Sequence, residues 1–381
     1  MTLDARILTA PEGLSEIEAD WRLLAEAREN AFVSPEWFRC WWSRFGDEHI
    51  PLVVAVRAAD GRLAGVLPLV EARGGRPRMA RFAGAALGDY FHPAAVRGEE
   101  VAVARAAAAA LRDAGGSWST LRLDHVGAEA EWWRELAEAG SPPLATVTQG
   151  SSTLPFASIR GLSWDQYLGG KSSNFRQQVR RRERRLVSDH GGRLRDHATE
   201  SELERGLEVF FDLHERRWRG GSTLASPRAK QFLTDFAVSA MRRGWMRLPV
   251  LEADGAPVAA LYGWRIGGRY AGYQTGLDPN WQQHSVGFVL WAMCLRAAIE
   301  EGAAVFDMML GDQPYKSRFG DQEEPVRTLT LVRSRHGDRV LISAEARLRA
   351  LARRTPGFGG SRAARVKRAI GSRLRSERGH G

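Results

Sequence analysis

The sequence has 381 residues, of which 44% are hydrophobic, so it is long enough for two domains and a tail. Its 13 Trp and 15 Phe argue against disorder over most of the length. The net charge of +10 is uneven: from Arg333 onward, 13 Arg and one Lys face three acidic residues, which gives +11, and the remainder carries −1. The basic excess belongs to a C-terminal appendage, and the balanced body argues against nucleic acid as a partner.

Several classes of protein and site are excluded by what the sequence lacks. Cys40 and Cys294 form no paired motif, which argues against a disulfide framework and a cysteine zinc site. The nine histidines have no metal-binding spacing, so we expect no catalytic metal. We see no signal peptide and no apolar run of the roughly 18 residues that span a bilayer. A cytoplasmic protein is expected, with a peripheral position at the inner membrane face as an alternative.

The first half of the chain predicts alternating strands and helices. Ser34-Pro35 has the N-cap and first-turn signature of a helix start. Asp60-Gly61 joins two apolar runs as a hairpin turn. In chain order we expect a strand at 6–9, helices at 14–27 and 35–45, strands at 52–56, 62–70 and 78–82, a helix at 99–114, a strand at 120–125 and a helix at 129–139.

The second half repeats this order. We expect helices at 164–168 and 173–186, a strand at 193–197, helices at 200–219 and 227–243, a three-stranded meander at 245–252, 258–266 and 269–277, a helix at 286–301, a strand at 304–310, a short helix at 314–319 and a last strand at 328–333. Two units of the same order predict an α/β fold with mixed sheets. The predicted domains are residues 1–155 and 156–335, followed by a basic, helical or partly disordered tail at 336–381.

One loop has features of an anion site. The meander ends at Leu277, and residues 278–285 lead directly into the helix that begins near Val286. A helix start offers N–H groups without internal partners and the positive end of a dipole, which favour a pyrophosphate. Gly287 lacks the Cβ that would keep a phosphate from the backbone. The alternative is an ordinary helix start with Ser285 as its N-cap.

The order of these elements resembles the GNAT acyltransferase superfamily. The pyrophosphate loop of that family runs Gln/Arg-x-x-Gly-x-Gly/Ala, and Gln282, Ser285 and Gly287 fall on this pattern, with Ser285 replacing the first glycine. A tyrosine on the helix after the next strand, here Tyr315, is a further shared feature. More closely the chain resembles the CelD-type, cellulose-biosynthesis-associated proteins, and more distantly the FemAB/FemX peptidyltransferases. The resemblance is strong over about 164–320 and loose over 30–160, where 32–42 and 89–93 match best.

The resemblance implies tandem GNAT-like domains, with a degenerate first domain on the acceptor side and a substrate cleft between the two. The second domain would hold acetyl-CoA or another acyl-CoA as co-substrate. The implied donor site comprises Thr275, Gly276, Leu277, Gln282, Gln283, His284, Ser285, Val286, Gly287 and Phe288.

Acyl transfer requires a base, a polarised carbonyl and a proton donor for the leaving thiolate. Asp312 is the expected base or amine-orienting carboxylate, or else it caps the following helix. Tyr315 can donate to the departing sulfur, or else it packs at the edge of the core. Lys316 can stabilise an oxyanion, or else it is a solvated surface lysine.

Acceptor binding is expected from a second set of side chains. Arg176, Arg180 and Arg184 share one face of a predicted helix and can hold phosphate or sugar-acid oxygens, although a solvated basic face is the alternative. His214 and Glu215 form a second possible base, or His214 is a half-buried packing residue. The predicted acceptor-binding residues are Arg176, Arg180, His214, Glu215, Trp218 and Tyr273.

The resulting hypothesis is an acyltransferase that moves an acyl group from acyl-CoA to an amine or hydroxyl of a sugar, nucleotide-sugar or envelope or polysaccharide precursor. Two alternatives stay open: an aminoacyl-tRNA-dependent, FemX-like peptidyltransferase, and a non-catalytic accessory protein of polysaccharide biosynthesis. The tail contains apolar stripes flanked by arginines, typical of a helix that meets anionic lipid or an acidic partner, and also compatible with a solvated tail.

Overall fold

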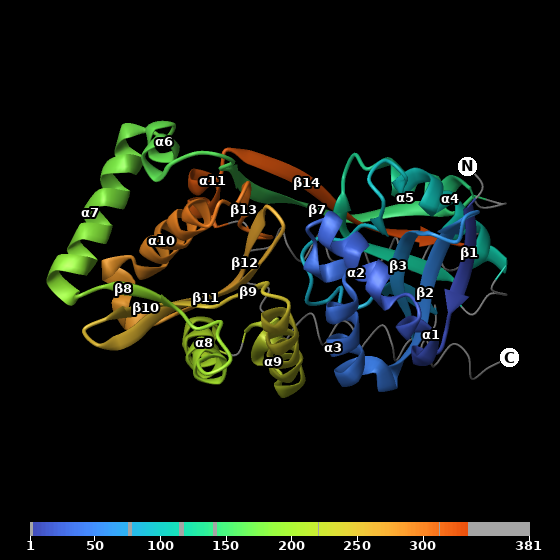
Figure 1. The fold of residues 1–381 in the computed structure, drawn as a ribbon, viewed down its shortest axis with the longest axis horizontal. Coiled ribbons are helices and arrows are strands. Elements are labelled where there is room, and N and C mark those ends of the chain that lie inside the picture. Colours follow the sequence, from blue (N-terminus) through green and yellow to red (C-terminus); the bar gives the residue numbers. More distant parts are fainter. Residues whose placement is uncertain are drawn as a thin grey trace, which may run out of the picture.

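The computed structural model describes residues 3–74, 78–113, 118–139, 143–219, 221–311 and 313–333, and the tail predicted at 336–381 lies outside them. Within these ranges a single mixed sheet of 14 strands runs the length of the molecule (Figure 1). In spatial order its strands are β1 (Leu3–Leu8), β2 (His49–Ala58), β3 (Leu63–Ala72), β4 (Met79–Phe82), β6 (Thr120–Gly127), β14 (Gln322–Val332), β7 (Ala145–Ser158), β13 (Val305–Asp307), β12 (Arg269–Leu277), β11 (Ala256–Ile266), β10 (Pro249–Ala253) and β8 (Arg193–Asp196), with β5 (Ala94–Ala95) on β3 and β9 (Met246–Arg247) on β11.

Helices cover both faces of this sheet, which confirms the predicted α/β class (Figure 1). The first half contains α1 (Pro11–Ser15), α2 (Glu18–Ala27), α3 (Pro35–Phe45), α4 (Glu100–Asp113) and α5 (Glu131–Glu138), with short 3-10 turns η1 (Ala31–Val33) and η2 (Gly46–Glu48). The second half contains α6 (Trp164–Gly169), α7 (Ser173–His190), α8 (Leu203–Trp218), η3 (Thr223–Ala225), α9 (Pro227–Arg242), η4 (Pro279–His284), α10 (Val286–Glu300) and α11 (Pro314–Phe319).

Helix starts follow the local sequence signals. The Ser34 hydroxyl accepts a hydrogen bond from the Trp37 N–H at 3.1 Å at the start of α3, as the sequence predicts. Ser163 and Gln166 form a reciprocal capping box at the start of α6. The helix predicted over 14–27 is instead two helices, because the helical conformation is interrupted between the end of α1 and the start of α2, near Ile17.

Two long strands join the halves of the molecule. β14 pairs antiparallel with β7 over its whole length and also with β6, where Val326 faces Gly127. β7 pairs with β13 only through residues 156–158, so Pro155 precedes that paired segment, and its carbonyl oxygen accepts from the Met308 N–H at 3.1 Å. The boundary predicted after residue 155 therefore falls inside β7.

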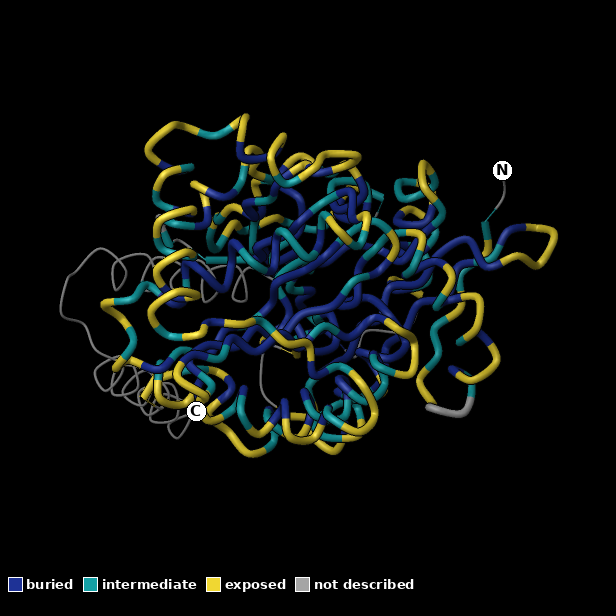
Figure 2. Tube along the Cα trace, turned by 60° about the vertical axis from the view of Figure 1, so that its left-hand side comes forward, coloured by how far each residue is buried: buried dark blue, intermediate teal, exposed yellow. Residues whose placement is uncertain are grey.

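The largest buried cluster also crosses between the halves. The Trp37 ring of α3 packs edge-on against Phe232 and Phe236 of α9, with centroids 4.7 and 5.1 Å apart. On the surface beside them, Arg44 donates to both carboxylate oxygens of Asp235 at 2.6 and 2.9 Å. Dark, buried tube segments accordingly continue through the centre of the molecule in Figure 2. The two halves form one packed body.

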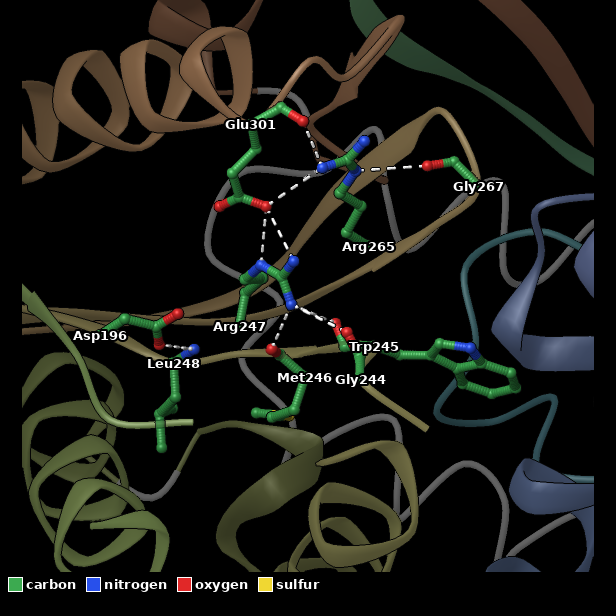
Figure 3. A network of polar contacts seen from close by, with 9 residues as sticks. All are labelled: Asp196, Gly244, Trp245, Met246, Arg247, Leu248, Arg265, Gly267 and Glu301. Carbon is green, nitrogen blue, oxygen red and sulfur yellow. Dashed lines mark hydrogen bonds and ion pairs between the residues drawn. The ribbon is translucent and has the colours of Figure 1, made fainter. Parts of the chain in front are cut away.

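A polar network fixes the C-terminal end of α10 (Figure 3). Arg247 of β9 donates to a Glu301 carboxylate oxygen from two nitrogens, at 2.8 and 2.9 Å, and Arg265 of β11 donates to the Glu301 carbonyl oxygen. Positive side chains at a helix C-terminus also complement its dipole. The network anchors α10 to β9 and β11, and the opposite end of this helix forms the wall of a cavity.

Candidate functional site

The sheet opens between β12 and β13. These strands are parallel neighbours only where residues 269–271 face residues 305–307. β12 continues to Leu277, whereas β13 ends at Asp307. Beyond residue 271, that edge of β12 has no paired strand within the described ranges. Its backbone groups are therefore satisfied by side chains, solvent or a ligand.

The turn after β13 is strained and firmly held. Met309 has φ 56°, which a residue with a Cβ rarely adopts. Its N–H donates to Asp307 Oδ1 at 2.8 Å, and Arg269 donates to the other Asp307 oxygen at 2.6 Å. The Lys316 ammonium donates to the Leu310 carbonyl oxygen at 2.6 Å. These contacts fix the turn beside the open edge of β12.

A cavity of about 380 Å³, the α10 cavity, lies at the N-terminus of α10. Seven of the ten predicted donor residues line it. The first N–H groups of a helix lack partners within the helix, so this wall of the cavity offers donors to an anion. The lining consists of Arg217, Thr275, Leu277, Asp278, Pro279, Gln282, Ser285, Val286, Gly287, Phe288, Trp291 and Tyr315.

Ser285 adopts the left-handed conformation, with φ 54° and ψ 39°, at the position where the family pattern has glycine. Its Cβ disfavours this conformation without preventing it. Ser285 occupies the N-cap position of α10, but its hydroxyl makes no capping hydrogen bond. A Cβ on Gly287 would lie 3.1 Å from Leu277 Cδ1, so close packing as well as ligand access favours glycine there.

Three predicted donor residues lie elsewhere. Gly276 faces α8, where an added Cβ would stand 2.6 Å from the His214 backbone nitrogen, so its role is packing. Gln283 contacts His284 side chain to side chain at 3.2 Å, and the His284 ring packs on Trp281 with centroids 5.0 Å apart. None of the three lines the α10 cavity.

A second cavity of about 270 Å³, the β12 cavity, adjoins the first. The two share Arg217, Thr275, Trp291 and Tyr315. Tyr315 of α11 therefore stands where the cavities meet, beside Trp291 at a ring-centroid distance of 6.1 Å. The lining consists of Arg217, Trp218, Gly221, Ser222, Thr223, Tyr273, Gln274, Thr275, Trp291, Leu310, Gln313, Tyr315 and Lys316.

Lys316 also lines the β12 cavity, but it is buried, with 6% of its surface exposed. Besides Leu310, its ammonium donates to the Met309 carbonyl oxygen at 3.4 Å. The surface-lysine alternative is thus inconsistent with the structure. Its contacts make Lys316 a positioning residue for the strained turn.

Arg217, at the end of α8, lines both cavities. It donates to the Thr275 hydroxyl, and its guanidinium lies 4.8 Å from the centre of the Trp218 ring. The neighbouring Arg216 is paired with Asp278 at 3.2 Å. Arg217 is therefore a cation shared by both cavities and held by the hydroxyl and carbonyl oxygens of Thr275 and by one aromatic face.

Asp89, from the first half of the chain, lies beside the same turn and accepts a hydrogen bond from the Leu310 N–H. Burial raises the pKa of its carboxyl to about 7, the Asp307 charge also raises it, and Lys316 and the Leu310 N–H act in the opposite direction. The residue keeps partial exposure. A carboxyl with a pKa near neutrality can exchange a proton near pH 7, but Asp89 is not among the residues that line the α10 or the β12 cavity.

The remaining predicted residues are placed as follows. Asp312 lies outside the described residues. Trp218 and Tyr273 line the β12 cavity, whereas His214 lies behind it, 97% buried, with a pKa lowered to about 4, chiefly by burial. Glu215 faces outward and pairs with Lys230 at 2.8 Å. His214 and Glu215 thus point to different environments, which does not fit a shared role as base.

The basic face of α7 stands apart from these cavities. Arg176 donates to the Lys171 carbonyl oxygen at 2.5 Å, and Arg180 lies 3.8 Å from Asp165 with 60% of its side chain exposed. Neither lines the α10 or β12 cavity. Arg176 and Arg180 therefore make local contacts with residues 165–171, and their role in acceptor binding stays a prediction.

Sequence reasoning missed Arg217 and Trp291, which line both cavities, and Asp89, which lies beside the turn after β13. Arg217 and Asp89 lie in segments that carry the family resemblance, and that resemblance was the available signal. Trp291 has the apolar spacing of a core helix and no separate signal. Within the described ranges no group of three or more His, Cys, Asp or Glu could hold a metal ion. No helix there is long and apolar enough to cross a membrane.

Comparisons with known proteins agree with this geometry. Residues 173–317 match the model of the acetyltransferase (GNAT) domain. No curated protein matches the chain in sequence. Among solved structures, FemX is 11% identical, with a TM-score of 0.61, covering 89% of this chain and all of FemX.

Two further solved structures have the same fold at low identity. The C-terminal domain of an Agrobacterium fabrum protein described as a lysylphosphatidylglycerol synthetase is 13% identical, with a TM-score of 0.56, covering 87% of this chain and 96% of that domain. L-PGS from Bacillus licheniformis is 13% identical, with a TM-score of 0.52, covering 89% of this chain and 97% of that one.

The domain match contains α8, β12 and α10 together with Tyr315 and Lys316, which are the parts that build both cavities. The surrounding architecture is the tandem, mixed α/β arrangement that FemX also has. Residues 173–317 therefore match a GNAT acetyltransferase domain, and the chain has a tandem GNAT-like, mixed α/β fold.

Proposed function

We propose that this protein transfers an acetyl or other acyl group from acyl-CoA to an amine or hydroxyl of a sugar, nucleotide-sugar or polysaccharide precursor. The observation that supports it most is the shared wall of the two cavities. Tyr315 lines both the cavity at the α10 N-terminus and the cavity at the open edge of β12. The narrower assignment to the cellulose-biosynthesis-associated group belongs to the same proposal.

The helix start would hold the pyrophosphate of the donor. The N-terminal residues Val286 and Gly287 line the α10 cavity, and Arg217 adds a positive charge to its lining. The thioester would then extend past Tyr315 to the open edge of β12, whose unpaired backbone groups can orient its carbonyl.

The chemical step needs two proton transfers. Asp89 accepts the proton of the acceptor amine or hydroxyl as that atom attacks the thioester carbonyl carbon. Tyr315 donates its proton to sulfur as the carbon–sulfur bond breaks, so the products are the acylated acceptor and free CoA. Lys316 keeps the Leu310 turn in place, and its charge holds the Asp89 pKa below the value that burial alone would give.

The test has two measurements on the full-length protein. Isothermal titration calorimetry should show binding of acetyl-CoA, and a thiol-reactive dye should report CoA release when an acceptor is supplied. Binding without CoA release for any amine or sugar acceptor would favour a non-catalytic role. Binding of aminoacyl-tRNA without binding of acetyl-CoA would contradict the acyl-CoA donor and support the FemX-like peptidyltransferase instead.

A further inference from the structure

A third cavity of about 430 Å³, the β14 cavity, lies on the other side of the strained turn. Leu310 lines both this cavity and the β12 cavity, so the two meet at that residue. The volume falls in the range of about 300–1,000 Å³ that is usual for small-molecule sites. The lining consists of Arg122, His125, Gln149, Gly150, Ser151, Ser152, Leu310, Gly311, Val326 and Thr328.

Two irregularities in the sheet create this space. The register of β14 shifts against β6 between Arg327 and Leu329, and against β7 between Thr328 and Leu329. On the β7 side, Thr328 faces Gly150 and Leu329 faces Thr148, which leaves Gln149 without an opposite residue. β-bulges re-aim side chains, and they occur frequently beside active sites.

A second bulge, in β6, re-aims side chains on the side of β14 that faces away from β7. His125 adopts φ 48°, and its N–H donates to the Thr328 hydroxyl at 3.3 Å. The side chains of His125 and Gln149, one from each bulged strand, therefore line a common cavity on either side of Thr328.

Hydrogen-bonding capacity in this cavity is unused. Gln149 Oε1 is buried and has no hydrogen-bond partner among the described residues. The Nδ1 atom of His125 lies 3.3 Å from the Gly88 carbonyl oxygen, which can only accept, so Nδ1 carries a proton. Burial lowers the pKa of His125 below its ordinary value, with Arg122 and Arg81 acting in the same direction and Asp124 and the Gly88 hydrogen bond opposing it. With its proton on Nδ1, the neutral ring presents Nε2 as an acceptor. An unsatisfied buried polar atom is costly, so a donor supplied by a ligand in this cavity would find an acceptor in Gln149 Oε1.

The cation at this cavity is already paired. Among the described residues of the lining, Arg122 is the one charged side chain, and its Nε donates to Asp124 at 2.7 Å. Arg81 donates to the other oxygen of the same carboxylate at 3.0 Å. A site for a phosphate would present a cation directed at the ligand, whereas this lining presents amide, imidazole and hydroxyl groups.

We propose that the β14 cavity binds the uncharged, hydroxyl-rich part of the acceptor, a sugar ring, and directs its amine or hydroxyl past Leu310 to the acyl group. This extends the proposed function and rests on it for the direction of transfer. Gln149 and His125 accept hydrogen bonds from ring hydroxyls, and Ser151, Ser152 and Thr328 exchange further ones. Gly311, at the edge of this cavity, leaves room for Lys316, since a Cβ there would stand 2.8 Å from Lys316 Nζ.

The substitution Gln149→Met should weaken sugar binding without lowering the stability of the fold. It keeps the length of the side chain and removes the amide, so the melting temperature should stay equal or rise, because a buried unsatisfied atom is lost. Loss of one buried hydrogen bond to the sugar should weaken sugar binding by about tenfold. The matched control is Gln231→Met, an exposed position on α9 outside all three cavities.

The probes are methyl glucoside, glucosamine and glucosamine 6-phosphate, measured by saturation-transfer NMR with and without saturating CoA. We expect the two unphosphorylated sugars to bind wild type and Gln231→Met, and to bind Gln149→Met about tenfold more weakly. Equal binding by Gln149→Met, binding of the phosphorylated sugar alone, or binding of none would each overturn the sugar site.

Acetyl-CoA binding, measured on the same samples, distinguishes the two proposals. Sugar binding without acetyl-CoA binding would refute the acyl-CoA donor and leave the sugar site standing. Acetyl-CoA binding and CoA release with no role for Gln149 would refute the sugar site alone.

Discussion

Asp89 and Lys316 come from opposite halves of the chain and interact electrostatically beside the turn that separates the β12 and β14 cavities. Asp89 follows the buried segment after β4, and Lys316 lies on α11. Neither half alone contains both groups. The proposed proton transfer therefore requires the two halves to be packed together.

Replacing Asp89 by Asn should lower turnover by about 10²-fold or more, because the base is lost. In wild type, kcat/KM should rise as the pH increases through about 7, where Asp89 loses its proton, and this rise should vanish in Asp89→Asn. Acetyl-CoA affinity should not change. The control is Asp212→Asn on the exposed side of α8, and a wild-type pH profile in the variant would exclude Asp89 as the base.

The same pKa predicts an effect on stability. Since the folded-state pKa of Asp89 is raised, the folded protein holds this proton more tightly than the unfolded chain. The contribution of Asp89 is therefore favourable in acid and is lost as the pH rises through about 7. Thermal unfolding followed at pH 5 and pH 8 should show a smaller fall in melting temperature for Asp89→Asn than for wild type.

Gly287→Asp should abolish acetyl-CoA binding, because a carboxylate at the α10 N-terminus repels the pyrophosphate and occupies its place. The fold should persist, since an acidic side chain is favourable at a helix start and the Leu277 methyl groups can give way. Gly287→Ala adds the same Cβ without the charge and should lose less affinity than Gly287→Asp, so the difference between the two variants measures the effect of the charge. Calorimetry checks both variants, and undiminished binding by a folded Gly287→Asp protein would remove the donor from this cavity.

Tyr315→Phe should reduce turnover by about 10²-fold if the hydroxyl protonates the leaving sulfur, with the acetyl-CoA dissociation constant preserved. Tyr262→Phe provides the contrast: its hydroxyl donates to the Leu233 carbonyl oxygen at 2.8 Å in the core. That change should lower the melting temperature and leave turnover intact. Steady-state kinetics with CoA release as the readout decides, and full activity of Tyr315→Phe would exclude the general-acid role.

Arg247→Met should lower the free energy of unfolding by about 1–3 kcal/mol, since it leaves Glu301 without its two strongest hydrogen bonds. Turnover per folded molecule should be preserved, because the network lies at the end of α10 opposite the cavity. Urea unfolding measures the change. A large loss of turnover at full stability would show that the network also sets the position of the helix start.

Truncation after Arg333 tests the basic tail. Arg333 itself should be kept, because it donates to the Leu111 carbonyl oxygen at 2.9 Å and lies over the Trp118 ring. We expect unchanged turnover with soluble substrate and loss of binding to anionic vesicles at low salt, since each engaged Arg contributes about 1 kcal/mol near such a surface. Equal vesicle binding by both proteins would exclude the localising role.

Local signals in the sequence were sufficient to predict those elements whose structure depends mainly on their own residues. The N-cap at Ser34 and the hairpin at Asp60-Gly61 both appear in the structure. β7 was missed, because its polar sequence contains Gly150 and Pro155, and its pairing partners β13 and β14 lie far along the chain. Long-range pairing overrides weak strand propensity there.

The site divides in the same way. The α10 cavity could be predicted, since its loop is contiguous and follows a family pattern, and the nearby Tyr315 follows the next strand. Asp89 and the β14 cavity could not, because they depend on register shifts and on contacts between halves that no local periodicity encodes. The density of arginines in α7 predicted acceptor binding, yet Arg176 and Arg180 contact neighbouring parts of the chain.

The position of β14 also governs the order in which the chain can fold. During synthesis, β6 emerges long before β14, so the edge of β6 that pairs with β14 stays unpaired until residues 322–332 leave the ribosome. Pairing across such a separation is slow to form, and an exposed strand edge invites association with other chains in the meantime. A nascent or truncated chain that ends before β14 is therefore the form most dependent on chaperones, and the completed sheet closes only when nearly the whole described chain has been made.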